Sequence, residues 1–295
     1  MGTPPADVVI DEALIAGLIR DQVPWLSHES VEIVANGWDN VTARLGEQFA
    51  ARLPRREVAV PLIRNEHRWL AGLADSLDVA VPAPVYCGTA TNGYPWPWSV
   101  VPWIDGRPAE RDPLKPGEAA SLGRILASLH RPAPGDAPSN PFRGVPLVDR
   151  DDGVRRRLAG IAARRADLAP VCEAARSVWA TACAAPFTDS AVWIHGDLHG
   201  RNVISDDGRI VGIIDWGDMA AGDRATDLAS VWTLFDEEDH ERFWTAYPHR
   251  DDGIHERTAG WAVAFGTMLL AAGLEDDGGF EAMGNALLSR VTRRR

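Results

Sequence analysis

Two short polar segments in the second half of the chain carry the side chains most suited to chemistry. His195–Asn202 reads HGDLHGRN, and Ile213–Asp218 reads IIDWGD. Asp197 and Asn202 lie five residues apart in a loop predicted to follow one strand, and Asp215 ends the next predicted strand. In phosphoryl transfer to a hydroxyl, one Asp accepts the hydroxyl proton, while an Asn and a second Asp bind Mg²⁺. The spacing therefore predicts this chemistry, with divalent ions held by oxygen ligands.

The two segments resemble those of the phosphotransferase family that includes aminoglycoside and macrolide phosphotransferases, choline kinases and homoserine kinases. The resemblance covers most of the chain, because four other features fall in the expected order: Asn36–Leu53, Glu66, Val100–Gly106 and Leu122–His130. It implies a fold of the α+β class. This is the bilobal protein-kinase-like fold, with a small β-rich N-terminal lobe and a larger, mostly helical C-terminal lobe.

The resemblance implies a role for each main residue of these segments. Asp197 would be the catalytic Asp that orients and deprotonates the hydroxyl of the acceptor. Asn202 and Asp215 would hold the metal ions. His195 would brace the loop, and Asp227 would receive backbone N–H groups from it. For Asp227 the alternative is a plain helix N-cap.

Three further polar residues of the segments keep two interpretations each. His199 either shapes the loop or lies beside the metal. Arg201 either contacts phosphate or substrate, or is solvated or salt-bridged. Asp218 is either a turn residue or faces the substrate.

The N-terminal lobe departs from the kinase pattern at its phosphate-binding residue. Kinases carry a lysine on the third strand, paired with a helix glutamate, whereas Arg52 occupies that position here. Lys115 is the only lysine and lies beyond the hinge. Arg52 could grip phosphate through its bidentate fork, with Glu66 as its partner, unless Glu66 is an exposed helix residue. Ala50 shares a strand face with Arg52 and could cover the adenine.

The predicted hinge is the segment Val101–Gly106. When Asp105-Gly106 is aligned with the end of the family's hinge, the resemblance assigns adenine recognition to the backbone carbonyl of Pro102 and the backbone N–H of Ile104. Proline keeps its carbonyl, so the assignment is feasible. Asn36–Asn40 is a candidate nucleotide loop only through its place before Arg52, because a simple hairpin turn would look the same.

The pattern of apolar residues predicts two lobes. Turn residues separate β-rich runs at 31–35, 41–45 and 49–53, which predicts an antiparallel meander. After Gly106 the chain is mostly helical, with one of the helices expected over 227–236, apart from a β-hairpin predicted from two runs at 192–195 and 210–214. We expect an N-terminal nucleotide-binding lobe over 1–101, a hinge over 102–106, and a C-terminal catalytic and substrate-binding lobe over 107–295.

Composition limits the classes of partner. A chain of 295 residues with 45% hydrophobic and 24% charged residues is globular, and its net charge of −12 argues against nucleic-acid binding. The three cysteines lack CxxC spacing and are expected to be reduced and buried, which points to a cytoplasmic protein. The start has no signal peptide pattern, and the longest apolar stretch, 261–274, is too short for a membrane span.

The resemblance implies ATP or GTP and Mg²⁺ as cofactors. The expected partner is a small hydroxylated acceptor, either an aminoglycoside-like antibiotic or another metabolite. Acidic clusters at 236–239 and 275–277 would suit a polycation, although solvated helix ends give the same pattern. Neither the acceptor nor the oligomeric state follows from the sequence.

Two other functions compete with a small-molecule kinase. A protein kinase is disfavoured because only about a dozen residues separate Asp215 from Asp227, too few for an activation segment. A catalytically silent module that binds nucleotide or ligand is motivated by the missing lysine. The presence of Asp197, Asn202 and Asp215 together argues against it, because a silent fold has no chemical need for all three.

Overall fold

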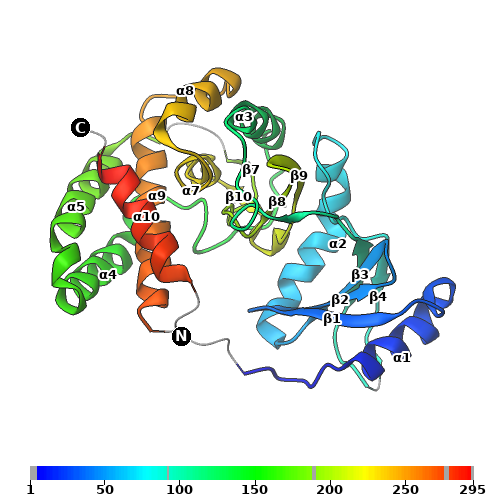
Figure 1. The fold of residues 1–295 in the computed structure, drawn as a ribbon. Helices are drawn as coiled ribbons and strands as arrows, with labels where there is room; N and C mark the ends of the chain where they lie inside the picture. The colour runs from blue at the N-terminus through cyan, green and yellow to red at the C-terminus, as the bar shows by residue number, and fades with distance from the viewer. Residues whose placement is uncertain (1–4, 92, 188–190, 276–278, 294–295) are drawn as a thin grey trace. The chain divides into compact units, whose positions relative to one another are not determined.

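The computed structural model describes residues 5–91, 93–187, 191–275 and 279–293. They form two compact units, drawn in Figure 1. The N-terminal unit contains the described residues up to Gly106 together with Val211–Gly217. The C-terminal unit contains residues 107–210 and those from 218 onward.

The N-terminal unit is built on a five-stranded antiparallel sheet with strand order β1-β2-β3-β5-β4. Its strands are β1 Val31–Asn36, β2 Asn40–Leu45, β3 Phe49–Pro54, β4 Tyr86–Gly88 and β5 Trp98–Pro102. Two helices accompany them, α1 Glu12–Gln22 and α2 Val60–Ala74. The antiparallel meander predicted for the first three strands is confirmed.

Apolar side chains on one face of this sheet form the core of the unit. Along β2 the residues alternate between half-buried and buried, with Val41, Ala43 and Leu45 inside. Period-two alternation is the expected pattern for a strand with one covered face. The helix α1 packs its Ile15 and Leu18 into the same cluster, and Asp11 caps it by accepting the N–H of Leu14 at 2.8 Å.

The segment Val211–Gly217 joins the N-terminal unit, although the sequence boundary at residue 107 would place it in the other lobe. Its backbone is bonded to Ala80. The Ala80 N–H donates to the carbonyl of Val211 at 3.3 Å, and the Ile213 N–H donates to the carbonyl of Ala80 at 3.0 Å. These bonds fix the strand that leads to Asp215.

Helices dominate the C-terminal unit. They are α3 Glu118–Leu129, α4 Asp151–Arg164, α5 Ala169–Ala184, α6 Ala225–Leu228, α7 Ser230–Leu234, α8 Glu237–Ala246, α9 Ile254–Gly273 and α10 Phe280–Arg293. Figure 1 shows α9 and α10 side by side, with α4 and α5 beside them. A Cβ atom on Gly284 would lie 2.3 Å from the backbone nitrogen of Leu270, so glycine permits the close approach of α10 to α9.

The short strands of the C-terminal unit correct one prediction. They are β6 Arg107–Pro108, β7 Val192–Ile194, β8 Val203–Asp206 and β10 Ala220–Gly222, together with β9 Arg209–Ile213, whose last three residues belong to the segment of the N-terminal unit. The hairpin expected between 192–195 and 210–214 is wrong, because β7 pairs with β10, whereas β9 follows β8. The β8–β9 turn is Asp207-Gly208, with φ of 48° and 71°. Asp-Gly is a strong hairpin signal, but β8 is too short to stand out in the sequence.

Three smaller expectations have mixed outcomes. One helix was expected from 227 to 236, whereas the structure has the two short helices α6 and α7. All three cysteines are free, but only Cys172 is buried, since Cys183 is half-buried and Cys87, on the edge strand β4, is exposed. Among the described residues, no helix is both long enough and apolar enough to cross a membrane.

Candidate active site

The loop that follows β7 is anchored by one buried carboxylate. Asp227 accepts the backbone N–H of His195 at 2.7 Å and that of Gly196 at 2.8 Å. Asp227 and His195 are both fully buried. A carboxylate that accepts two backbone N–H groups in a buried place makes strong bonds, so it fixes the start of the loop. Asp227 thus bonds the loop rather than capping only its own helix.

A histidine and a tyrosine complete the support behind this carboxylate. Nε2 of His130 lies 3.2 Å from Oδ2 of Asp227, and Nδ1 of His130 lies 2.7 Å from the hydroxyl of Tyr247. Burial lowers the pKa of His130, and the bond to Asp227 offsets only part of that effect. We infer that His130 is neutral and donates through Nε2, which leaves Nδ1 to accept from Tyr247.

Gly196 lets the loop turn directly after His195. Its φ is +89°, in the left-handed region that favours glycine. A Cβ atom at this position would lie 2.6 Å from the carbonyl oxygen of Asp218. The glycine of the HGD motif is therefore required both by backbone conformation and by space.

Asp197 comes next in the loop, and two cationic or polar side chains flank its carboxylate. Nη2 of Arg143 lies 3.0 Å from Oδ1, and Nε2 of His199 lies 3.4 Å from Oδ2. The side chain of Asp197 keeps 23% exposure, so the carboxylate is reachable. Burial alone would raise the pKa of Asp197, but the His199 hydrogen bond and the Arg143 charge lower it far below its ordinary value. Asp197 is thus a carboxylate at neutral pH.

Arg143 is the residue of this site that sequence reasoning missed. It lies outside every regular helix and strand and 54 positions before Asp197. Its Nε also lies 3.6 Å from Oδ2 of Asp218, and its guanidinium stacks over the ring of Phe265 at 5.0 Å. No motif in the sequence marks Arg143. The only available signal was an arginine in a loop of the C-terminal lobe.

Asn202 is tied to the same loop. Its Nδ2 donates to the backbone carbonyl of Asp197 at 2.8 Å. This bond uses the nitrogen of the amide, so it does not occupy Oδ1, the atom that a cation would need. His199 also sets the loop, because its Nδ1 accepts the N–H of Arg201 at 3.2 Å.

The side chains of Arg201 and Asp218 form hydrogen bonds with other side chains of the protein. Nε of Arg201 lies 2.8 Å from Oε2 of Glu110, and its guanidinium stacks over Phe280 at 4.1 Å. Asp218 accepts from the side-chain amide of Asn140 at 2.7 Å. The salt-bridged interpretation of Arg201 and the turn interpretation of Asp218 therefore fit the structure.

In the N-terminal unit, Arg52 is the centre of the predicted phosphate-binding residues. Its Nη1 donates to Oε2 of Glu66 at 2.7 Å, and its Nη2 lies 3.4 Å from Oδ1 of Asp215. Arg52 is 7% exposed and Glu66 only 1%, so this glutamate is not an exposed helix residue. Burial lowers the pKa of Arg52, but the two carboxylates outweigh burial and raise it.

Asp215 is held in an unusual backbone conformation. Its φ is +62°, which is rare for a residue with a side chain. The following Trp216 is fully buried and donates its indole N–H to the carbonyl of Ile213 at 2.9 Å. This buried ring anchors the turn and leaves the Asp215 side chain 58% exposed. Strained residues of this kind cluster at functional sites.

The predicted adenine-binding residues lie along β3 and at the end of β5. Ala50 is buried in β3. The Trp103 N–H donates to the carbonyl of Gln48 at 2.8 Å, and Pro102 pairs with Phe49. Pro102 therefore takes a non-hydrogen-bonded position in the ladder, so its missing N–H breaks no bond and its carbonyl points away from β3. Ile104, two residues on, packs against the backbone of Gly212.

The candidate nucleotide loop is a tight connection between β1 and β2. The Gly37 N–H donates to the carbonyl of Asn40 at 2.9 Å, and Arg55 donates to the carbonyl of Gly37 at 2.9 Å. This geometry is that of a hairpin turn held by an arginine. It keeps the simple-turn interpretation open.

Asn202 and Asp215 offer oxygen donors, which hard cations such as Mg²⁺ prefer. Within the described ranges, no group of three or more His, Cys, Asp or Glu side chains could hold a metal ion. Mg²⁺ commonly uses only one or two protein carboxylates and completes its shell with water and substrate phosphates. Each of these two side chains thus offers the kind of donor that Mg²⁺ takes alongside nucleotide phosphates, and neither belongs to a closed structural metal site formed by described residues.

Two of the four carboxylates in the first acidic cluster, 236–239, pair with arginines. Asp236 pairs with Arg290 at 2.9 Å, and Asp239 pairs with Arg242. In the second cluster Glu275 is described, whereas residues 276 and 277 lie outside the described residues. These pairs reduce the negative charge that the first cluster offers to a polycation without removing it.

The model of the phosphotransferase enzyme family matches residues 30–262. The chain belongs to this family. It is therefore a phosphotransferase by family, as the two motif segments predicted. The match includes both segments and the whole sheet of the N-terminal unit.

Two of the curated relatives are named as phosphotransferases of viomycin and of aminoglycosides. The chain is 31% identical to viomycin phosphotransferase of Streptomyces vinaceus over 209 residues, 64% of this chain and 68% of the relative. It is 40% identical to an aminoglycoside 3'-phosphotransferase of Escherichia coli, but over only 52 residues, 18% of this chain and 19% of the relative.

Solved structures confirm the predicted kinase-like fold. The complex of an APH(2") enzyme with GDP and kanamycin has a TM-score of 0.69 at 18% identity and covers 95% of this chain and 99% of its own. A macrolide 2'-phosphotransferase from Brachybacterium faecium has a TM-score of 0.59 at 22% identity and covers 94% and 97%. At these identities the likeness establishes the fold alone.

Proposed function

We propose that the protein transfers the γ-phosphoryl group of ATP or GTP to a hydroxyl of a small molecule, with Mg²⁺ as the metal. Membership of the phosphotransferase enzyme family supports the reaction class. The observation that carries the proposal is the bond from the Asn202 amide to the backbone carbonyl of Asp197 at 2.8 Å. One loop thereby holds a carboxylate that can accept a proton and an amide oxygen that can bind a cation.

Asp197 acts on the acceptor. Its carboxylate hydrogen-bonds the acceptor hydroxyl and orients the oxygen for in-line attack on the γ-phosphorus. The new O–P bond forms as the bond from phosphorus to the β–γ bridging oxygen breaks, and the nucleoside diphosphate leaves. The hydroxyl proton passes to Asp197. Arg143 and His199 keep this group ionised before the reaction, so it is always ready to accept a hydrogen bond.

Arg52, Asn202 and Asp215 act on the phosphates. Arg52 offers a planar fork to phosphate oxygens and keeps its charge when buried. Glu66 fixes the orientation of Arg52 through the 2.7 Å bond. Asn202 and Asp215 would hold Mg²⁺, which neutralises charge on the phosphates when bound. Arginine thus takes the role that lysine has in other kinases.

The base of the nucleotide contacts the hinge residues Pro102 and Ile104 and the β3 residue Ala50. The Pro102 carbonyl accepts from the base, and the Ile104 N–H donates to it. This pair of groups, two residues apart, can read adenine or guanine. Ala50 covers one face of the base without filling the space a larger side chain would take.

The acceptor is a small hydroxylated compound, and the names of the relatives favour an antibiotic. Viomycin and aminoglycosides are the compounds in those names. A cytoplasmic reaction fits the use of nucleoside triphosphate, and no nucleic-acid or membrane partner is part of the proposal.

A coupled assay of nucleoside diphosphate release over a panel of hydroxylated compounds, including viomycin, kanamycin and amino alcohols, tests the proposal. We expect turnover of at least one acceptor and loss of about 10³-fold or more in Asp197→Ala. Nucleotide binding, followed by calorimetry with Mg²⁺, should persist in that variant. Asp21→Ala, an exposed change on α1, is the matched control. Nucleotide binding without turnover of any acceptor would instead identify a silent module.

A further inference from the structure

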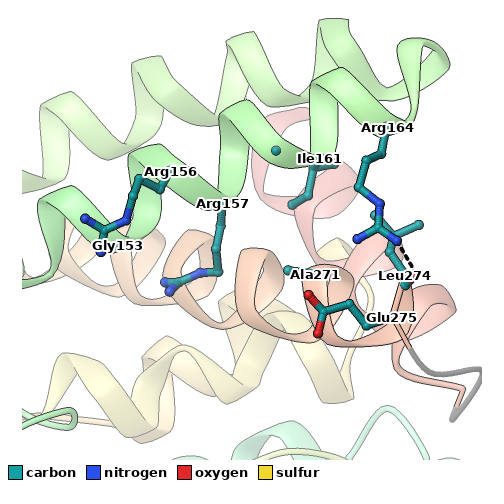
Figure 2. A pocket seen from close by; sticks show the side chains of 9 residues that line it. Gly153, Arg156, Arg157, Ile161, Arg164, Ala271, Leu274 and Glu275 are labelled. Carbon is teal, nitrogen blue, oxygen red and sulfur yellow. Dashed lines mark hydrogen bonds between the residues drawn. The ribbon is translucent and has the colours of Figure 1, made fainter. Parts of the chain in front are cut away.

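A groove of about 270 Å³ lies between α4 and α9 in the C-terminal unit, and Figure 2 shows the side chains that line it. Arg156 and Arg157 lie toward one end, and Arg164 and Glu275 lie toward the other. Three arginines and one glutamate give the lining a net positive charge. A cationic groove is unexpected in a chain whose net charge is −12.

Small residues keep the groove open. Gly153 and Gly160 lie two turns apart on the same side of α4, and Ala271 lies opposite on α9. A Cβ atom on Gly160 would have no other atom within 4 Å. A glycine inside a helix costs about 1 kcal/mol relative to alanine, so its presence at an open position needs a reason other than packing.

The arginines on the groove are short of negative partners. Nε of Arg157 donates to the Thr267 hydroxyl at 3.2 Å. Among the described residues, neither Arg156 nor Arg157 forms an ion pair with a carboxylate. By contrast, the neighbouring Arg155 is not among the residues that line the groove, and it pairs with Asp151 at 2.7 Å. Arg164 is also engaged, because it donates to the carbonyl of Leu274.

Arg157 is half-buried, so its charge is partly desolvated as well as close to other arginines. Burial lowers the pKa of Arg157 to about 10, and repulsion from Arg150 and Arg156 adds to the effect. Nε of Arg150 is buried with no hydrogen-bond partner in the described part of the chain. Like charges gathered around a half-buried guanidinium are unfavourable, although Arg156 itself is exposed. A bound anion would remove this repulsion.

We propose that the groove between α4 and α9 binds an anionic group, a phosphate or a carboxylate, through the guanidinium groups of Arg156 and Arg157. Arginine presents its donors as a fork that matches both groups in a bidentate way. A hollow of about 270 Å³ holds one such group with part of the molecule that carries it.

The helix α9 contacts both the groove and Arg143, the residue that bonds Asp197. Thr267 of α9 contacts Arg157, while Met268 lies 3.9 Å from Arg143. Arg143 in turn bonds Asp197. The anionic group can therefore belong to the acceptor itself, which would then be an acid rather than a polycation, or to a separate phosphate or carboxylate. The second source does not depend on the proposed function.

Titration calorimetry of the full chain with inorganic phosphate and with citrate, at ionic strength held constant with NaCl, tests the site. We expect binding to weaken at least about tenfold in Arg156→Gln/Arg157→Gln, which removes two charge-assisted contacts. Gly160→Leu should weaken it similarly by filling the groove while favouring the helix. Arg155→Gln, with the same loss of charge on the same helix, should leave binding within about twofold of the parent.

Phosphate could also bind near Arg52, and the variant Arg52→Gln distinguishes that binding from binding in the groove. Binding that is lost in Arg52→Gln and kept in both groove variants would overturn the proposal, as would equal weakening in Arg155→Gln. Circular dichroism and the unfolding midpoint establish that each variant is folded. Because calorimetry measures binding without turnover, the anion site can fail while phosphoryl transfer stands, and the reverse also holds.

Once an acceptor is found, inhibition of turnover by citrate shows whether the groove binds an acid group of the acceptor or a separate anion. Competition with the acceptor, abolished by Gly160→Leu, assigns the groove to the acid group of the acceptor. Citrate binding that leaves the KM of the acceptor unchanged assigns the groove to a separate anion. Both results support an anion site.

Discussion

The guanidinium of Arg143 lies 3.0 Å from the carboxylate of Asp197, and the two residues are 54 positions apart in the chain. The contact places a permanent positive charge against the group proposed to receive the acceptor proton. Since Asp197 is held well below its ordinary pKa, it works chiefly by orienting the hydroxyl. A carboxylate so weak in basicity accepts the proton only late in the transfer.

Replacing Arg143 by methionine should move the acidic limb of kcat to higher pH. The lost charge stabilised the ionised form of Asp197, and an arginine beside an aspartate typically lowers its pKa by about one to three units. The profile of kcat against pH measures this, with Arg143→Lys as the variant that keeps the charge. An acidic limb that stays in place in Arg143→Met would show that Arg143 does not act on the protonation of Asp197.

Breaking the Arg52–Glu66 pair should destabilise the N-terminal unit. Glu66→Leu would leave the buried guanidinium with only the more distant Asp215, and loss of one partner of a buried pair typically costs about 3–5 kcal/mol. Urea unfolding measures the change. The double variant Arg52→Met/Glu66→Leu should be more stable than Glu66→Leu, because no buried charge is left unpaired. Simple additivity of the two single changes would contradict a coupled pair.

Variants of Arg52 should also change nucleotide binding, which is measured separately from stability. Arg52→Met is expected to raise the KM for nucleotide more than Arg52→Lys does, since lysine keeps a charge for the phosphates. Lysine loses the fork, however, so it should not restore the parent value. Steady-state kinetics at saturating acceptor measure both. Equal KM values in the parent and in Arg52→Met would remove Arg52 from the nucleotide site.

Local spacing was enough to find the residues of the two motif segments. Asp197, Asn202 and Asp215 lie within about twenty residues, so their order in the sequence already indicates a shared task. Glu66 was named as the partner of Arg52 from helix and strand periodicity together with the resemblance, and the two side chains meet at 2.7 Å. The antiparallel meander followed from turn residues between β-rich runs for the same reason: the signals are local.

What the sequence did not reveal depends on contacts between distant segments. Arg143 contacts Asp197 directly, whereas Tyr247 supports the loop only through His130 and Asp227, and no periodicity marks either residue. The pairing of β7 with β10 was missed because β10 is three residues of alanine and glycine. The arginines of the groove read as ordinary solvated residues of α4, because only the packing of α9 shows which of them lack a carboxylate.

Stability should fall as the pH drops below the ordinary histidine value, in part through His130. The pKa of this buried residue is lowered from 6.5 in the folded state, so the unfolded chain binds the proton more readily. The contribution of His130 to the free energy of unfolding is therefore full above about pH 6.5 and declines as the pH falls toward the lowered pKa of the folded state. His130→Gln should flatten that part of the dependence in urea titrations at several pH values, whereas the exposed His28→Gln should not. An unchanged slope in His130→Gln would show that other groups cause it.

Gly196→Ala should damage both the fold and the proposed chemistry. A side chain at φ of +89° is strained, and its Cβ would lie 2.6 Å from the carbonyl of Asp218. Left-handed strain alone costs about 1–2 kcal/mol, so we expect a loss of at least about 2 kcal/mol in the free energy of unfolding. Any shift of the loop moves Asp197, and a misplacement of about 1 Å can cost about 100-fold in kcat. Gly135→Ala, where a Cβ meets nothing within 4 Å, is the matched control, and near-parent stability and turnover in Gly196→Ala would contradict the fixed loop geometry.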